Sequence, residues 1–117
     1  MGGFFKDNKE KMQTSDVLKI VEHEIGDNWA ISNAHGVDLK NCLLSTPVKT
    51  SFLDPSQGGS PKELWIVLEE LPEQKTGYKI VFDEKVRKFG LAITDTQTKQ
   101  NVFLGIYGSF LNTLMAM

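Results

Sequence analysis

The chain has 117 residues, of which 40% are hydrophobic and 24% charged. This length and composition are typical of one globular domain and argue against a disordered or fibrous protein. Thirteen Lys and Arg against fifteen Asp and Glu give a formal net charge of -2, so no strong positive field is available for phosphate backbones or anionic lipid. We therefore expect a single domain over residues 1–117, with neither nucleic acid nor membrane as a partner.

The N-terminus and the cysteine content favour a cytoplasmic protein. The first six residues, MGGFFK, lack a signal-peptide core, and no apolar run is long enough to span a bilayer. Gly2 suggests myristoylation, but that motif requires Ser or Thr where Lys6 stands. The single cysteine, Cys42, cannot close an intrachain disulfide. A buried apolar role is expected for it rather than that of a nucleophile.

An amphipathic helix is predicted over residues 15–26, after a frayed polar lead-in over residues 1–14. Thr14 or Ser15 is expected to cap its start, and Gly26 to end it in a left-handed conformation. Apolar residues recur at spacings of three and four and so share one helix face: Val17, Leu18, Val21 and Ile25. This face is expected to pack on the core.

The segment that follows carries weaker signals. Residues 29–34, 38–45 and 47–53 are rich in β-branched and apolar residues and are interrupted by Asn33, Gly36 and Pro47, which predicts three short strands. Residues 54–61, DPSQGGSP, contain two prolines and two glycines and no apolar side chain other than proline. They are predicted to form a loop inside the domain.

Four strands are predicted in the second half, over residues 64–70, 78–84, 89–95 and 101–107. Only short polar turns separate them, and such turns allow antiparallel hairpins but not parallel crossovers. A last short helix is expected after Ser109, with Phe110, Leu111, Leu114 and Met115 on one stripe. The predicted fold class is therefore α+β, an antiparallel β-meander of at least four strands with an N-terminal amphipathic helix and a short C-terminal helix.

The alternation within these strands divides the predicted sheet into two faces. One consistent register places the following residues on a core face: Ile66, Leu68, Tyr78, Ile80, Phe82, Phe89, Leu91, Ile93, Val102, Leu104 and Ile106. The opposite face carries more apolar residues than a solvated face should: Trp65, Val67, Val81, Phe103 and Tyr107. These five are the candidate protein-contact residues, and the expected partner is a second copy of the chain in a homodimer or another protein.

No motif indicates a catalytic, metal or cofactor site. His23 lacks a second histidine at the HExxH spacing, because position 27 is Asp. His35 precedes Gly36 and is expected to lie in a turn. Five carboxylates are predicted to form a solvated acidic rim: Glu69, Glu70, Glu73, Asp83 and Glu84. Of these, Glu69 is predicted to face Lys79 across neighbouring strands, and the other four to lie near strand ends or turns. No catalytic residues, cofactor or metal are expected from these patterns.

The sequence favours a small non-enzymatic protein-binding or regulatory module, of the general class that includes bacterial immunity and adaptor proteins. The alternative is a small hydrolase-type enzyme that uses His35 with a carboxylate of the acidic rim. The two differ in what the structure should contain. An enzyme should show a deep pocket where His35 meets Glu69, Glu70 or Asp83, whereas a binding module should show a flat or shallow apolar surface.

Overall fold

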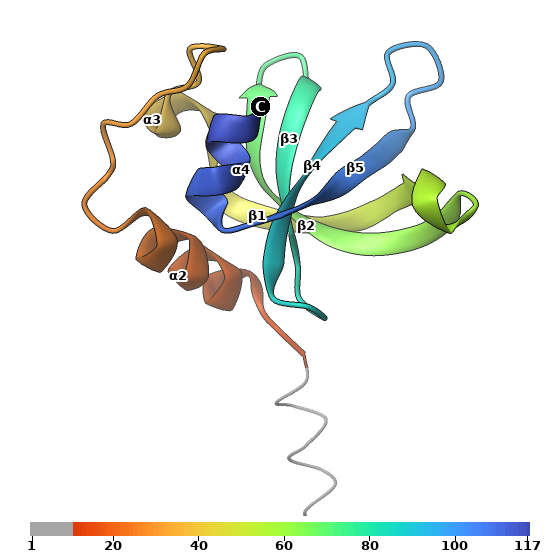
Figure 1. The fold of residues 1–117 in the computed structure, drawn as a ribbon, viewed down its shortest axis with the longest axis horizontal. Coiled ribbons are helices and arrows are strands. Elements are labelled where there is room, and N and C mark those ends of the chain that lie inside the picture. The colour runs from red at the N-terminus through yellow and green to blue at the C-terminus, as the bar shows by residue number, and fades with distance from the viewer. Residues whose placement is uncertain (1–10) are drawn as a thin grey trace, which may run out of the picture.

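The computed structural model describes residues 11–117, so most of the predicted lead-in lies outside the described residues. The elements in chain order are helix α2 (Thr14–Ile25), helix α3 (Leu39–Cys42), strand β1 (Leu43–Asp54), 3-10 helix η1 (Pro55–Gln57), strands β2 (Ser60–Leu71), β3 (Thr76–Asp83), β4 (Lys88–Thr94) and β5 (Asn101–Gly108), and helix α4 (Phe110–Ala116). The predicted α+β class is confirmed, with a meander of five strands (Figure 1).

The five strands curl into a closed barrel in sequence order. Each strand pairs antiparallel with the next along the chain. In a meander with an odd number of strands, the first and the last run in the same direction. The closing contact between β1 and β5 is accordingly parallel, and its ladder consists of one residue pair, Leu53 with Val102. The barrel therefore has four extended antiparallel ladders and one short parallel contact, between β1 and β5.

Helices α2 and α4 pack together against one outer side of the barrel (Figure 1). The predicted apolar face of α2 is buried at Val17, Val21 and Ile25. A long-range hydrogen bond joins the two helices, because the backbone N–H of Phe110 at the start of α4 donates to Glu24 Oε1 at 2.9 Å. Neither short helix would be stable alone, so tertiary packing holds both in place.

The ends of the helices follow the sequence signals with one correction. The α2 cap is Gln13 rather than Thr14 or Ser15, and its backbone N–H donates to Asp16 Oδ2 at 2.8 Å. Gly26 ends α2 as predicted and has a positive φ of 58, but its ψ of -119 lies outside the expected left-handed helical conformation. Ser109 caps α4, because its Oγ accepts the Asn112 N–H at 3.1 Å.

Both faces of the sheet are buried, and they form two separate apolar cores. The helix-side core lies between the helices and the outside of the barrel and includes Val17, Val21, Ile25, Trp65, Val67, Leu68, Ile80, Phe82, Phe89, Leu91, Phe110 and Leu114. The barrel core fills the interior and consists of Phe52, Leu64, Ile66, Val81, Ala92 and Phe103. The expectation of one core face and one face left for a partner is therefore wrong, since curling the sheet encloses the second face.

A β-bulge in β2 explains why the predicted faces were mixed. The register shifts between Ile66 and Leu68, so Val67 is an extra residue on β2. Trp65 therefore lies opposite Phe82 and Leu68 opposite Ile80, and all four point to the helix side. Ile66, predicted on the same face as Leu68, faces the barrel interior instead.

Strand β5 departs further from the predicted alternation. Its ladder with β4 shifts twice, which leaves Leu104 and Tyr107 without partners in the register. Leu104 and Ile106, predicted in the core, are 49% and 39% exposed. Gly90 and Gly105 lie so close together here that a side chain on Gly90 would overlap the carbonyl oxygen of Gly105.

Residues 29–53 are the part of the fold that the sequence predicted least well. No strand forms over residues 29–34, and residues 39–42 form α3, whose start is capped by Asp38 accepting the Lys40 N–H at 3.0 Å. The other two predicted strands are joined in β1, which runs through Pro47. Proline is tolerated there because β1 pairs with β5 through a single residue pair and its ladder with β2 skips position 47.

Candidate functional site

A pocket of about 520 Å³ opens at the end of the barrel where β1 turns through η1 into β2. Its wall is completed by the turn between β3 and β4. The lining residues, which define the barrel-end pocket, are Lys49, Asp54, Gln57, Ser60, Pro61, Lys62, Glu63, Asp83, Glu84 and Lys85. Seven of the ten carry a formal charge, whereas pockets for drug-sized ligands are lined mostly by apolar and aromatic side chains.

Lys62 lies at the centre of this charge cluster. Its Nζ is 3.2 Å from Asp83 Oδ2, 3.8 Å from Asp54 Oδ2 and 4.6 Å from the centroid of the Phe103 ring. The two aspartate side chains are only 5% and 6% exposed. A buried carboxylate is costly unless it is paired and hydrogen-bonded, so the ammonium group of Lys62 and its attraction to the ring face stabilise the end of the barrel core.

Each aspartate ends a strand and fastens the turn that follows it. Asp54 Oδ1 accepts the Ser56 N–H at 3.0 Å and the Ser56 hydroxyl at 2.7 Å. Asp83 Oδ1 accepts the Lys85 N–H at 2.9 Å. Aspartate commonly makes such bonds to backbone two residues ahead. Both carboxylates thus have one oxygen held by the backbone and the other directed at Lys62.

Glu84, in the wall of the pocket, connects the pocket to the helix-side core through a hydrogen bond with Trp65. The Trp65 indole N–H donates to Glu84 Oε1 at 2.7 Å, and Lys49 Nζ is 3.2 Å from the same oxygen. Burial acts to raise the pKa of Glu84, but the Trp65 hydrogen bond and the nearby Lys49 and Arg87 outweigh it and hold that pKa below its ordinary value. Glu84 is therefore an anion at neutral pH with its charge already matched.

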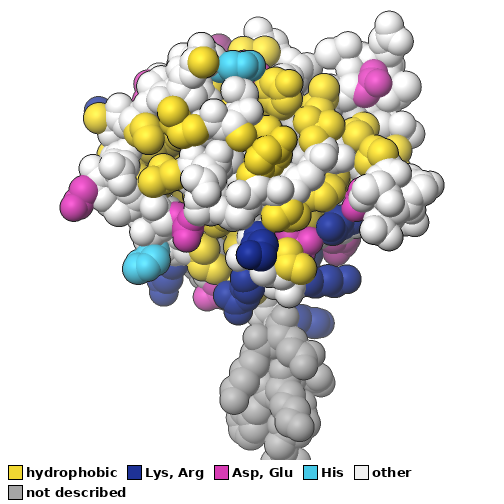
Figure 2. All heavy atoms as spheres, viewed as in Figure 1, with side chains coloured by type: hydrophobic (Ala, Val, Ile, Leu, Met, Phe, Trp, Pro, Cys, Tyr) yellow, Lys and Arg dark blue, Asp and Glu magenta, His cyan; other side chains and the backbone are white. Residues whose placement is uncertain are grey.

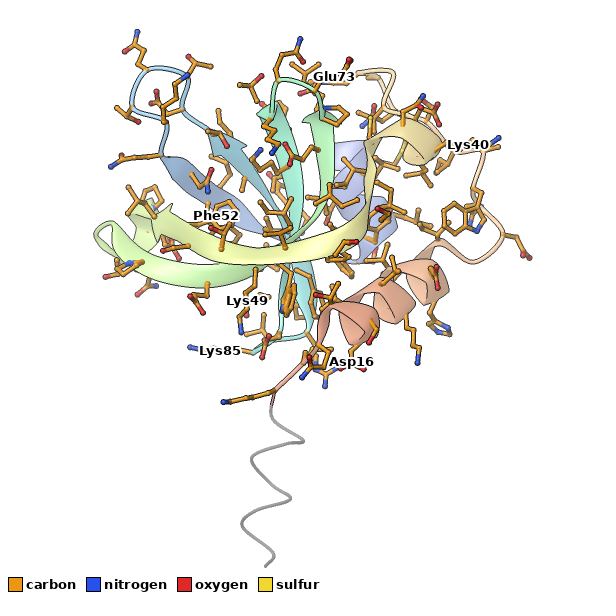
Figure 3. The ribbon with its side chains drawn as sticks, turned by 180° about the vertical axis from the view of Figure 1, so that it is seen from behind. Asp16, Lys40, Lys49, Phe52, Glu73 and Lys85 are labelled. Atoms are coloured by element: carbon orange, nitrogen blue, oxygen red, sulfur yellow. The ribbon has the colours of Figure 1, made fainter. Side chains whose placement is uncertain are left out.

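Lys49 and Lys85 are less fully engaged than the three paired carboxylates of the pocket, Asp54, Asp83 and Glu84. Lys49 has one carboxylate partner and a side chain 37% exposed, and Lys85 is exposed with no ion pair within residues 11–117. Figure 3 shows Lys49 and Lys85 at the same end of the molecule, far from Glu73 and Lys40. Both lysines therefore have ammonium donors that a visiting group can reach.

The histidine and carboxylate of the enzymatic alternative do meet, at the other end of β2. His35 Nδ1 is 2.7 Å from Glu70 Oε2, and the Tyr78 ring lies edge-on to the imidazole at 5.6 Å. Glu70 Oε1 accepts the Tyr78 backbone N–H at 3.0 Å. Burial acts to raise the pKa of Glu70, but the Tyr78 N–H and His35 lower it overall. Neither His35 nor Glu70 lines the barrel-end pocket.

Glu69 and Lys79 face each other across β2 and β3 as predicted, with Nζ and Oε1 2.9 Å apart. The prediction that this pair belongs to a solvated rim is wrong, because Lys79 is 3% exposed and Glu69 8%. Lys79 Nζ also donates to the Lys75 carbonyl at 3.2 Å. Lys79 alternates with Ile80 along β3 and so lies on the barrel-interior side.

The five candidate protein-contact residues do not form one surface. Trp65 and Val67 belong to the helix-side core, and Val81 and Phe103 to the barrel core. Tyr107 alone is well exposed, at 46%. No sequence motif marks Lys49, Asp54 and Lys62 as site residues, although an Asp followed by Pro-Ser at a strand end is a recognisable turn signal.

The remaining chemistry-bearing residues are scattered. Cys42 is buried, as expected, with its Sγ 3.6 Å from the Glu70 carbonyl oxygen. Within residues 11–117 no group of three His, Cys, Asp or Glu side chains is placed to hold a metal ion. In the same range no helix has the length and apolar character to cross a membrane. Comparison with protein families, curated proteins and solved structures gives no match.

Proposed function

We propose that this protein is a non-enzymatic binding module that contacts another protein through the barrel-end pocket. The observation that carries the proposal is a polar pocket in which three of the four carboxylates are fixed and paired, while Lys49 and Lys85 retain free hydrogen-bond donors. Among the described residues its lining includes no imidazole, thiol or phenol. Such a lining is suited to charge recognition, whereas acid–base or nucleophilic catalysis requires a group that titrates near neutrality or an activated nucleophile.

A macromolecular partner is favoured over a small molecule by the composition of the wall. Small-molecule sites bury most of their ligand against apolar and aromatic side chains. Here the side chains are mainly charged, several are half-exposed or exposed, and they come from β1, β2 and the β3–β4 turn. Charged groups arranged in this way contribute specificity and association rate to protein contacts more than raw affinity.

The pairing of His35 with Glu70 favours a hydrolase-type enzyme as the second candidate. A carboxylate that holds one imidazole nitrogen at 2.7 Å leaves the other nitrogen available as a general base. The side chain of His35 is 36% exposed, so substrate could reach it. The large pocket, however, lies at the other end of β2, and this separation makes the binding module the better-supported function.

The proposal can be tested by capturing partners from an extract of the source cells. Three immobilised forms are compared, namely the wild type, Lys49→Ala/Lys85→Ala and Lys19→Ala, the last a control for an exposed lysine on α2. We expect a protein that wild type and control retain equally and that the double variant retains about tenfold less, a loss of about 1.4 kcal/mol. No specifically retained protein, or equal retention by all three forms, would overturn the proposal.

A further inference from the structure

We infer that the barrel-end pocket recognises an acidic segment of its protein partner, one that presents Asp or Glu carboxylates. This inference rests on the proposed function, because it names the partner chemistry of the same site. The sign of the ligand charge is not evident from the lining, which carries three lysines and four carboxylates. It follows instead from which of these charges are still available to a ligand.

Three of the four carboxylates are directed inward and already satisfied. Asp54 and Asp83 are nearly buried and share Lys62, and each holds backbone with its second oxygen. Glu84 accepts from Trp65 and Lys49 at one oxygen and is 15% exposed. A cationic ligand would have to displace Lys62 or Lys49 to reach them and would leave a lysine unpaired. Only Glu63 remains exposed.

The cations, by contrast, face outward. An ammonium group has three donors. Lys85 has no ion pair within the described chain, and Lys49 directs one donor to Glu84 while its Nζ lies 5.6 Å from the centroid of the Trp65 ring, so both keep donors for a ligand. Arg87 and Lys88, in and beside the β3–β4 turn, are exposed and have no ion pair within residues 11–117. Figure 2 shows Lys and Arg side chains gathered at the lower end of the molecule, where the β3–β4 turn lies in Figure 1.

The local charge therefore opposes that of the whole chain. The formal net charge of the protein is -2, yet Lys49 and Lys85 line the pocket as exposed cations, and Arg87 and Lys88 are exposed in and beside the β3–β4 turn. These four cations form a positive rim, set against Glu63, the single exposed carboxylate of the lining. Complementary potentials steer encounter and penalise partners of like charge. Val86, 51% exposed within the same turn, adds an apolar contact between the cations. An acidic peptide segment fits this rim, and a basic one would be repelled by it.

The test is a titration of the full-length protein at low ionic strength, followed by the backbone amide signals of Lys49 and Lys85 and the indole signal of Trp65 in NMR spectra. The probes are hexaglutamate, hexalysine and a short single-stranded DNA. Lys85→Glu is the test variant and Lys19→Glu is the matched control on α2. We expect hexaglutamate to shift these signals, and Lys85→Glu to weaken its binding about fivefold or more while Lys19→Glu does not.

Several results would overturn the inference. They are shifts by hexalysine instead of hexaglutamate, tighter binding of the DNA at the same residues, equal effects of the two variants, or no response to any probe. Binding of hexalysine would leave the pocket as a contact site and remove only its preference for acidic segments. Failure of the partner-capture experiment, in contrast, would remove the pocket as the contact site whatever the peptides do.

Discussion

Phe82 is closely packed in the helix-side core. It is 1% exposed, and its ring centroid lies 4.9 Å from that of Phe89, which in turn packs edge-on against Phe110. Truncation of a large buried aromatic leaves a cavity that its neighbours fill only partly, so Phe82→Ala should lower the free energy of unfolding by about 3–5 kcal/mol. Urea denaturation measures this. A loss below about 1 kcal/mol would place Phe82 outside a packed core.

Gly90 is required by close approach of two strands. A Cβ at this position would overlap the carbonyl oxygen of Gly105 and lie 3.0 Å from the Phe103 ring. Gly90→Ala should therefore force β4 and β5 apart and lower the free energy of unfolding by about 2 kcal/mol. Thermal or urea denaturation measures the loss, with Ser51→Ala at an exposed position on β1 as the control variant. Equal stability of the two would contradict the observed contact.

Glu70 should make the stability of the fold depend on pH. Its pKa is lowered in the folded state, so its stabilising effect is present above the ordinary carboxyl pKa and is lost as the pH falls through the folded pKa. Glu70→Gln keeps an acceptor for the Tyr78 N–H but removes the charge that faces His35. We expect this variant to be less stable than wild type at pH 7 and the difference to close below about pH 4. A constant difference at both pH values would contradict the charge argument.

At the scale of elements, the buried Glu69–Lys79 pair joins β2 to β3 inside the barrel. Removing one partner of a buried pair leaves an uncompensated charge and typically costs about 3–5 kcal/mol, whereas an apolar pair of similar volume is often tolerated. Lys79→Met should thus be strongly destabilising, and Glu69→Leu/Lys79→Met should recover most of the loss. Denaturation of the single and double variants decides this. A double variant no more stable than Lys79→Met would show that the two side chains are not coupled.

The elements that the sequence predicted correctly are those with local signals. The period of three and four around Val17 and Val21, the polar turns between the last four strands and the cap at Ser109 each specify local structure, and α2, β2 to β5 and α4 follow. The faces could not be predicted beyond the extra residue at Val67, because a bulge reverses the alternation without any compositional signal. Residues 29–42 form no strand although their β-branched and apolar residues predicted strands in this part of the chain, because tertiary context overrides local β-propensity.

The candidate site was predicted only in fragments. The acidic strand ends and the loop after Asp54 are evident in the sequence, but their meeting around Lys62 depends on the pairing of β1 and β3 with the two edges of β2. This tertiary pairing brings the end of β1 near the β3–β4 turn, which is separated from it along the chain. The contact between His35 and Glu70 has the same origin, because it depends on how the segment before α3 folds over the end of β2.

At the scale of the whole molecule, the exposed apolar residues of β5 bear on self-association. Leu104, Ile106 and Tyr107 are each at least 39% exposed on one strand. We expect weak homodimerisation in which Tyr107→Ala weakens the association by about 2 kcal/mol, as aromatic anchors do. Trp65→Ala should lower stability instead, since Trp65 is 6% exposed and bonded to Glu84. Sedimentation velocity measures both, and a wild type that stays monomeric at every concentration would contradict the expectation.

The assignment of the barrel-end pocket as the contact site is tested most directly by cross-saturation NMR on the complex with the captured partner. Saturation of the partner's protons attenuates amide signals only where the two proteins touch. If the barrel-end pocket is the contact site, we expect attenuation at Lys49, Ser60 and Lys85, with residues on the outer face of α2 unaffected. Attenuation confined to His35 and its neighbours, or to β5 around Tyr107, would contradict it and move the functional site to the other end of β2 or to the apolar strand.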